Sequence, residues 1–263
     1  MENLLSTLPS LKEVFMNPVS YIVYIIYGGL IIWEAIGPAE KLPHVNFWKL
    51  KGFLSFILFF LLSSYLPYLW DGFLSKYQLL DLTSLGTVFG GIVGVFVYEL
   101  GEYIWHRTMH NSDFLWKVFH QMHHSAERLD SFGAFYFSPV DMIGWTALSS
   151  LCLVLVAGFT PEATVFIILV TNFMSIFQHA NVKTPQWIGY LIQRPESHNI
   201  HHGRGIHAYN YCGLPLYDII FGTFKNPKSY ENKTGFYDGA SSKIMEMISF
   251  KDISIRANLK NKA

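Results

Sequence analysis

Five uncharged apolar runs divide the chain, and the charged residues lie between them. The runs are Val19–Trp33, Gly52–Trp70, Gly86–Tyr98, Met142–Pro161 and Ala163–Val182. A helix needs roughly 20 residues to cross a bilayer core about 30 Å thick, whereas a buried strand is shorter. The second, fourth and fifth runs have nearly this length. The first reaches it by continuing past Glu34 to Gly37, and the third only through Glu99 and Glu102. The pattern predicts an all-α membrane protein with about four to five transmembrane helices.

The basic residues are distributed unevenly around these runs. If the five helices alternate across a bilayer, Lys12 and Lys76 lie on one side and every other Lys and Arg lies on the opposite side. An excess of basic residues in short loops marks the cytoplasmic face. We therefore expect a multi-pass protein with an external N-terminus, in a bacterial inner membrane rather than the endoplasmic reticulum. The N-terminus lacks a basic region, so we expect no cleaved signal peptide.

The composition agrees with a membrane protein and excludes several other classes. Hydrophobic residues make up 51% of the chain and charged residues 14%, against about 25% charged in typical soluble domains. This is the opposite of the composition of disordered chains. The formal net charge is zero, which gives no support to nucleic-acid binding. The chain has two cysteines, one of them inside an apolar run, so a disulfide framework is not expected.

The order of these features predicts three parts. Residues 1–85 would form N-terminal membrane helices, residues 86–227 a central domain that contains the remaining helices, and residues 228–263 a polar C-terminal tail. Within the tail, Lys243–Ile255 is predicted as an amphipathic helix on the membrane surface.

Nine of the eleven histidines lie between positions 106 and 202, in repeated spacings. The groups are His106 and His110, then His120, His123 and His124, then His179 alone, and finally His198, His201 and His202. Residues three and four apart share a face of a helix, so each group would form a chelating patch if helical. The predicted topology places all nine at the cytoplasmic ends of the membrane helices. We therefore expect a cytoplasmic helical cap that carries the histidine boxes.

Nine imidazoles exceed the four ligands of one structural zinc site, so two metals with about four or five ligands each are expected. Imidazole binds iron, zinc, copper and nickel, and the ligands alone leave the metal open. The chain has no Cys-x-x-Cys pair and no glycine pattern for a nucleotide. Iron is favoured if the substrate is apolar, because oxidising an unactivated C–H bond requires oxygen activated at a redox metal.

The histidine boxes, the His179–Asn181 element and the stretch Asn210–Phe224 together resemble the fatty acid hydroxylase/sterol desaturase superfamily of membrane di-iron oxygenases. The resemblance covers roughly residues 98–227. It implies two iron ions, with zinc able to replace them in purified protein, and dioxygen as co-substrate. It also implies a membrane lipid as substrate and a separate electron-donor protein or reductant. The implied ligands are His106, His110, His120, His123, His124, His179, His198, His201 and His202.

One stretch departs from the family pattern. Many members carry a His-Pro-acidic element after the second box, and here Ser138, Pro139 and Asp141 occupy that stretch. A serine cannot replace imidazole as a ligand or base, so any role of that histidine is absent here. Four further residues are candidates for orienting the ligands, with pairing to nearby basic groups, solvation or loop capping as alternatives. They are Glu102, Asp130, Asn181 and His207.

The leading functional hypothesis is an oxygen-dependent hydroxylase of a fatty acyl or sterol-like lipid. Desaturation by the same site and pterin-dependent ether-lipid oxidation are the enzymatic alternatives. A divalent-metal transporter is the alternative from another class. Transport sites lie near the membrane midplane, whereas these histidines follow helix ends, which counts against transport.

Overall fold

The computed structural model describes residues 8–254, and nearly all regular structure in them is helical. The helices are α2 (Leu11–Phe15), α3 (Pro18–Ile36), α4 (Trp48–Tyr65), α5 (Pro67–Leu74), α6 (Gly86–Asn111), α7 (Asp113–Leu115), α8 (Gln121–His124), α9 (Pro139–Ser150), α10 (Pro161–Phe177), α11 (Pro195–His201), α12 (Pro215–Ile220) and α13 (Ile244–Ile248). Two short strands, β1 (Leu80–Asp81) and β2 (Ala157–Gly158), pair in parallel. The mostly helical fold class predicted from the apolar runs is confirmed.

Three of the long helices, α3, α9 and α10, begin where the sequence supplies a capping side chain followed by proline. Asn17, Ser138 and Thr160 each accept a backbone N–H from the first turn of α3, α9 and α10 respectively. A proline follows each cap, at a position where its missing N–H leaves no intrahelical hydrogen bond unmade. The local sequence therefore determines where these three helices begin.

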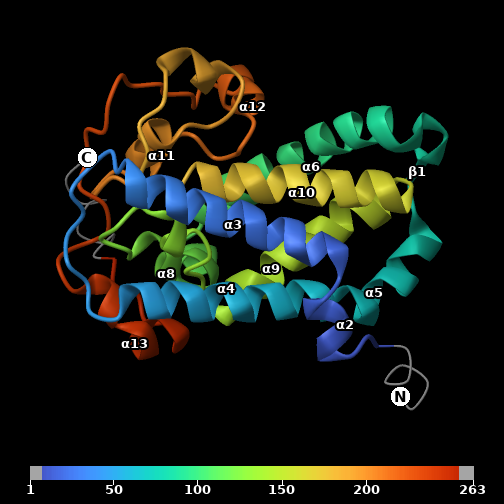
Figure 1. The fold of residues 1–263 in the computed structure, drawn as a ribbon, viewed down its shortest axis with the longest axis horizontal. Helices are drawn as coiled ribbons and strands as arrows, with labels where there is room; N and C mark the ends of the chain where they lie inside the picture. The colour runs from blue at the N-terminus through green and yellow to red at the C-terminus, as the bar shows by residue number, and fades with distance from the viewer. Residues whose placement is uncertain (1–7, 255–263) are drawn as a thin grey trace.

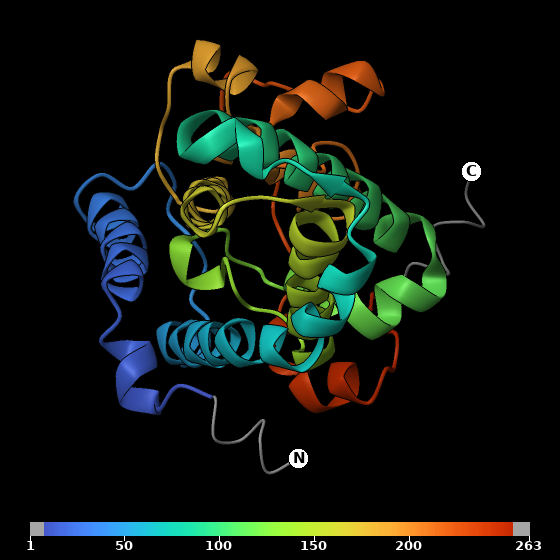
Figure 2. The ribbon, with the colours of Figure 1, turned by 90° about the vertical axis from the view of Figure 1, so that its right-hand side faces the viewer.

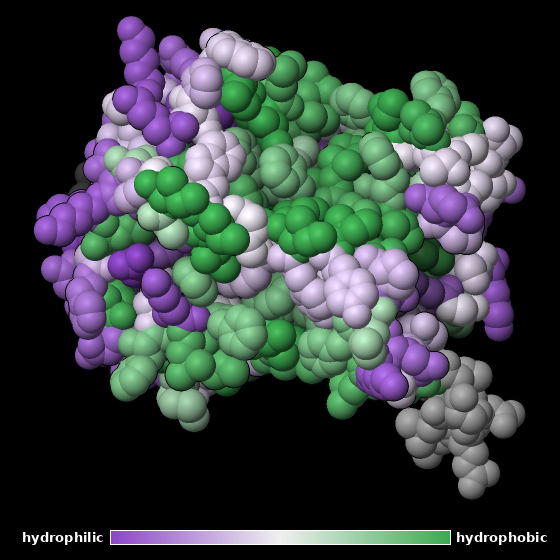
Figure 3. Space-filling view, viewed as in Figure 1, coloured by the Kyte–Doolittle hydropathy of each residue, from purple (hydrophilic) through white to green (hydrophobic). Residues whose placement is uncertain are grey.

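Four helical segments are long and apolar enough to cross a membrane. They are Pro18–Ile36, Trp48–Tyr77, Thr83–Asn111 and Pro139–Val156. The fifth predicted run forms only the 17-residue helix Pro161–Phe177, because the α-helix ends at Phe177 and a turn follows at Gln178 and His179. The expected full-length fifth span is thus a shorter helix. Figure 3 shows apolar side chains covering the middle of the molecule, with polar side chains at both ends. These features indicate an integral membrane protein.

Successive long helices alternate in direction, so α3, α6 and α10 run toward one end of the bundle and α4 and α9 run toward the other (Figure 1). The segments that contain the histidine boxes lie at the end where α11 is found (Figure 1), and Figure 2 views the bundle from its opposite end. The β1–β2 pair lies at the opposite end and ties the loop after α5 to the end of α9, with Leu79 N–H bonded to Leu155 O. The histidines therefore share one end of the bundle, as alternation of the helices predicts.

Helices α6 and α10 pack in close contact because glycines line α6. A Cβ on Gly91 would overlap the ring of Phe166, and a Cβ on Gly94 would overlap the side chain of Ile167. Small residues let membrane helices approach closely, since dispersion contacts rather than water exclusion hold them together. This contact sets the spacing of α6, which carries His106, from the end of α10, which leads to His179.

The segment after Pro227 packs against the histidine end of the bundle. Phe236, Ala240, Met247 and Ile253 are buried in one cluster with Trp116. The expected amphipathic helix over Lys243–Ile255 is wrong in extent, because only α13 is helical there. Phe250 has φ of 59°, in the left-handed region, and Ile255 lies outside the described residues. This turn breaks the helix and directs Ile253 into the cluster instead of toward a membrane surface.

Candidate functional site

All nine box histidines gather in two groups at one end of the bundle. In each group the nitrogen atoms that face one another lie within 4.8 Å, and every side chain is buried. The first group contains His106, His110, His120, His124 and His201. The second group contains His123, His179, His198 and His202. We call them the five-histidine cluster and the four-histidine cluster.

The two H-x2-H-H boxes do not form separate patches, which corrects the expectation from spacing. His120 and His124 enter the five-histidine cluster, whereas His123 enters the other. His198 and His202 enter the four-histidine cluster, whereas His201 crosses to the first. Successive helical residues turn by about 100°, so positions four apart point the same way and the position between them diverges. The middle histidine of each box therefore joins the cluster that contains the two outer histidines of the other box.

A single short segment orients three rings of the five-histidine cluster. The backbone carbonyls of His207, Tyr209 and Tyr211 accept the Nδ1 hydrogens of His110 at 2.8 Å, His201 at 2.7 Å and His106 at 2.6 Å respectively. A carbonyl can only accept, so Nδ1 of each ring carries the hydrogen and Nε2 carries the lone pair. The alternate residues 207, 209 and 211 thus fix which nitrogen each ring presents to the cluster.

This segment has a strained backbone conformation, and the buried side chains of Asp218 and Asn210 hold it in place. His207, Tyr209 and Asn210 have φ of 43°, 69° and 50°, in the left-handed region that non-glycine residues rarely adopt. The Asp218 carboxylate accepts the backbone N–H groups of Tyr211 and Cys212. Asn210 donates to Ser197 O and Lys225 O. Because these contacts overdetermine an unfavourable conformation, the three carbonyls keep their positions.

His120 is oriented by a carboxylate. Asp141 Oδ2 lies 3.0 Å from His120 Nδ1, and both side chains are almost completely buried. Ser138, the residue that departs from the family pattern, caps α9 by accepting the N–H of Asp141. In the four-histidine cluster, Ser175 O accepts the Nδ1 hydrogen of His179 at 2.6 Å. The sequence marked Asp141 only as the acidic residue of the stretch that departs from the family pattern, and not as a partner of His120.

The Nε2 atoms of several rings in the two clusters lie close to one another. His106 Nε2 and His120 Nε2 are 2.8 Å apart, and His179 Nε2 lies 2.9 Å from His123 Nε2 and 3.1 Å from His198 Nε2. With the hydrogens of His106 and His120 on Nδ1, the first contact brings two lone pairs together, and Nε2 of His179, whose hydrogen is also on Nδ1, presents its single lone pair to two other rings. A cation between the nitrogens would convert that repulsion into coordination. The donor set therefore fits a metal in each cluster.

Burial keeps these rings in the form that binds metal. It lowers the pKa of His179 to about 4, and it lowers the pKa of His124, His198 and His202 well below the ordinary value, with neighbouring imidazoles adding to the effect on these three. A neutral ring with an available lone pair is the ligand form of histidine. The site is therefore prepared for metal at neutral pH.

The candidate orienting residues have different surroundings. The carbonyl of His207 accepts from His110, and its ring Nδ1 lies 3.1 Å from Nδ1 of His124. Asp130 instead caps a turn by accepting the N–H of Gly133, and Asn181 bonds the backbone of Glu40. Glu102 lines the cavity described next, while the ring of His106 donates to Tyr211 O rather than to this carboxylate. Asp130 also pairs with Arg128 and accepts the Nε1 hydrogen of Trp48, so turn capping and pairing with a basic group are both observed for it.

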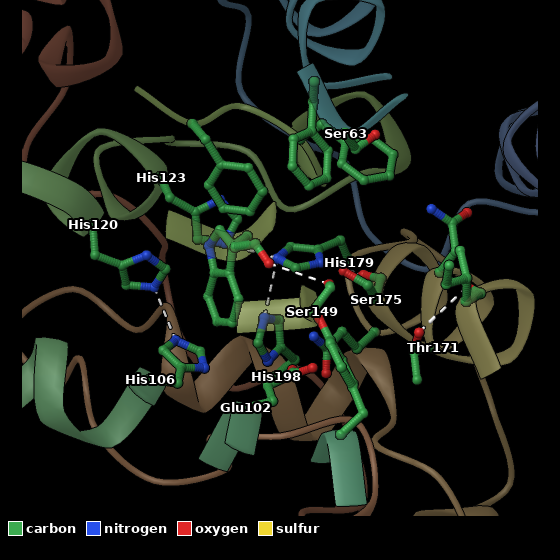
Figure 4. Close-up of a pocket in the computed structure, with 18 of the residues that line it drawn as sticks. Ser63, Glu102, His106, His120, His123, Ser149, Thr171, Ser175, His179 and His198 are labelled. Atoms are coloured by element: carbon green, nitrogen blue, oxygen red, sulfur yellow. Dashed lines mark hydrogen bonds between the residues drawn. The ribbon is translucent and has the colours of Figure 1, made fainter. Parts of the chain in front are cut away.

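A cavity of about 140 Å³ opens beside both clusters. One part of its lining consists of histidines, namely His106, His120, His123, His179 and His198. Ser63 and Thr171 belong to other parts of the lining, away from His106 and His120 in Figure 4. Aromatic side chains complete much of the remaining wall; they are Phe59, Phe135, Phe137 and Trp145. A second cavity of about 340 Å³ shares part of this wall and continues between α3, α4, α9 and α10. The arrangement offers an apolar chain a path to the histidines.

Comparison with known proteins gives a matching family and several relatives. Residues 91–223 match the family described as fatty acid hydroxylase. The chain is 26% identical over 146 residues to sphinganine C4-monooxygenase 1 of Arabidopsis thaliana, covering 54% of this chain and 56% of that protein. It is 30% identical over 140 residues to ornithine lipid hydroxylase OlsE of Rhizobium tropici, covering 52% and 42%. It is 31% identical over 172 residues to human alkylglycerol monooxygenase, covering 62% and 36%. The chain spans about half the length of these curated relatives or less, and no solved structure matches it.

Proposed function

The chain belongs to the fatty acid hydroxylase family, and from that premise we propose that it is a membrane enzyme that uses dioxygen to hydroxylate a lipid. The observation that carries the proposal is the pairing of two buried histidine clusters with an adjoining, largely apolar cavity. Relatives named as hydroxylases and monooxygenases support the same reaction class.

We propose that the nine cluster histidines hold a pair of iron ions. Bound iron would supply the redox chemistry that side chains lack, namely activation of dioxygen toward an unactivated C–H bond. In the balanced reaction one oxygen atom enters the C–H bond and the other leaves as water, with two electrons and two protons consumed. The electrons would come from a separate electron-transfer protein or another external reductant.

The residues of this chain would bind the metal, orient its ligands and exclude water. The carbonyls of residues 207, 209 and 211 and the Asp141 carboxylate hold hydrogens on Nδ1, which leaves Nε2 of each ring for the metal. Phe135, Phe137 and Trp145 close the cavity beside the rings and would shield the reacting carbon from water. An apolar chain would thereby displace water from the wall that it contacts.

The remaining assignments follow the same proposal. Residues 86–227 would form the catalytic domain, residues 1–85 the N-terminal membrane helices, and residues 228–263 a C-terminal region. The basic residues near the histidine end support a cytoplasmic site in a bacterial inner membrane.

The test compares lipids from cells with and without the chain, grown under isotopic dioxygen. We expect one lipid class to gain labelled oxygen, and His123→Ala and His201→Ala variants to lose both the label and the bound metal. Their folding is checked by monodisperse elution in detergent. An unlabelled unsaturated product would indicate desaturation. Metal flux in liposomes without an oxidised lipid would indicate transport, and either result would contradict hydroxylation.

A further inference from the structure

Three buried carboxyl groups lie next to the segment that orients the five-histidine cluster. Glu99 and Glu102 are three residues apart on one face of α6, and Asp218 belongs to α12, which follows that segment. Their exposed fractions are 0%, 8% and 0%. Among residues 8–254 none of the three forms an ion pair with a lysine or arginine. Ionisable groups within membrane helices are costly and are functional candidates for that reason.

The two glutamates have few hydrogen-bond donors between them. Glu99 Oε2 accepts the N–H of Leu214 at 2.7 Å, and its Oε1 atom is buried with no hydrogen-bond partner in the described part of the chain. The backbone N–H of Gly213 lies near both glutamates. Two neighbouring carboxylates in a buried site without a cation cannot both be ionised, because like charges repel strongly where water is excluded. The pair therefore holds at least one proton at neutral pH.

Glu102 is the carboxyl group of this set that lines the cavity beside the histidines. Figure 4 shows it in the lower part of the view, together with His106 and His198. Among residues 8–254 its carboxyl group forms no hydrogen bond or ion pair with a histidine, since His106 donates to a backbone carbonyl and His198 contacts other rings. The Glu102 carboxyl group is thus available to exchange a proton with a molecule in the cavity.

A chain of hydrogen bonds connects Asp218 with the surface. The Thr223 hydroxyl donates to Asp218 Oδ1 at 2.6 Å, and Tyr103 Oη lies 3.1 Å from Thr223 Oγ1. The single hydrogen of Thr223 is used on Asp218, so Tyr103 is the donor to Thr223. Arg107 donates to Tyr103 Oη at 2.8 Å. Thr223 is partly exposed and Asp218 is fully buried. Because every hydrogen in this chain points inward, the chain is arranged to carry a proton toward the buried carboxyl groups.

We propose that Glu102 donates a proton to the oxygen atom that leaves as water, and that Glu99 and Asp218 restore that proton. This inference rests on the proposed function, which consumes two protons and two electrons for each dioxygen. In the transfer step the O–H bond of the Glu102 carboxyl group breaks and an O–H bond of the departing water forms, while the external reductant supplies the electrons. Glu102 then regains a proton from Glu99, which solvent replaces through Thr223 and Asp218.

The first test needs no turnover. The full chain with metal bound is purified in a detergent without ester groups, and its infrared spectrum is recorded at neutral pH in H2O and in D2O. The C=O stretch of a protonated carboxyl group is identified by its shift in D2O. We expect Glu102→Gln to weaken this band and Glu127→Gln to leave it unchanged. Glu127 is the matched control, because it is 6% exposed but lines a different cavity and accepts the N–H of Ser241.

The second test measures turnover. Reduced protein is mixed with isotopic dioxygen and the total lipid extract of the host cells, and the rate of label incorporation is recorded. We expect a rate about 100-fold lower in Glu102→Gln at unchanged metal content, and a smaller loss in Glu102→Asp, which keeps a carboxyl group. Acetate should restore part of the rate to Glu102→Ala, because a small acid can occupy the space left by the side chain. A merely structural role of Glu102 would not respond to acetate.

Two results would each overturn the assignment of Glu102 as a proton donor. One is an unchanged infrared band, or a wild-type rate, in Glu102→Gln. The other is a Glu102→Asp variant that is no faster than Glu102→Gln, combined with no effect of acetate on Glu102→Ala; this pattern would indicate a structural role.

The outcomes for Glu102 and for the proposed function are separable. If no lipid gains label, but Glu102→Gln weakens the infrared band and slows dioxygen consumption by the reduced protein, the proton donor is retained and the hydroxylase is rejected. If lipid gains label equally fast in the wild type and in Glu102→Gln, the hydroxylase is retained and the proton donor is rejected.

Discussion

Asp141 lies outside every histidine box, yet its carboxylate determines how one of the candidate ligands is presented. Its Oδ2 atom is 3.0 Å from His120 Nδ1, so Nε2 of that ring faces His106. Partners of this kind fix the ring and raise the basicity of the nitrogen that binds metal.

We predict that Asp141→Asn weakens metal binding by about ten-fold or more, because a neutral amide holds the hydrogen on Nδ1 less strongly than a carboxylate. Competition with a chromophoric chelator measures the affinity. Asp81→Asn is the matched control, since that carboxylate lies in β1 at the other end and contacts only its neighbour Thr83 among the described side chains. An unchanged affinity in Asp141→Asn would show that this carboxylate does not support the ligand.

At the residue scale the sequence identified the histidines but not what orients them. The spacing selected eight of the nine rings that the structure brings together, and the predicted topology added His179. It could not indicate the carbonyls of residues 207, 209 and 211, because every residue has a carbonyl and only the backbone conformation directs these three inward. It also could not assign His123 and His201 to opposite clusters, since a three-residue spacing is compatible with either direction.

At the scale of helices, the contact between α6 and α10 connects ordinary packing to the histidine clusters. Gly94 faces Ile167, whose side chain is fully buried, so a larger residue there has no room without movement of one helix. Movement of either helix would displace His106 or His179 from its cluster.

We therefore expect Gly94→Leu to destabilise the protein by about 1–3 kcal/mol and to lower the amount of bound metal. Thermal unfolding in detergent and metal analysis of the purified protein provide the two measurements. Gly28→Leu on α3 is the control, because a Cβ at Gly28 meets no atom within 4 Å. Equal stability and metal content in the two variants would argue against the helix contact as the determinant.

The apolar runs predicted the helices well where composition alone decides their length. They failed at the end of α10, where the chain leaves the helix at Gln178 although the uncharged run continues to Val182. They failed again after Lys243, where a helix of five residues ends before Phe250. In both places burial of a later side chain, His179 or Ile253, takes precedence over the local pattern.

At the scale of the whole molecule, many imidazoles are concentrated in one buried region. Burial holds the pKa of His179 at about 4, and the pKa values of His124, His198 and His202 are also lowered, whereas an unfolded histidine titrates near 6.5. Between these values the unfolded chain binds protons that the folded chain does not. Stability is therefore present above about pH 6.5 and is lost as the pH falls toward 4.

Because the unfolded chain binds more protons than the folded chain in this range, we predict that the Tm of the metal-free protein falls steadily as the pH is lowered from 7 to 5. The measurement is thermal unfolding after metal removal by a chelator, repeated across this range. His44→Gln should show the same slope, because His44 lies in an exposed loop away from the clusters. A Tm that does not change over this range would contradict buried, neutral rings.

The exchange of His123 and His201 between the boxes has a consequence for how the centre assembles. Neither histidine cluster is complete until α8 and α11 have packed together, so neither cluster can form independently of the other. We expect the second and third boxes to fold in one cooperative event, together with binding of the first metal ion. Damage to either box should then disable both halves together, leaving no stable protein with a single ion.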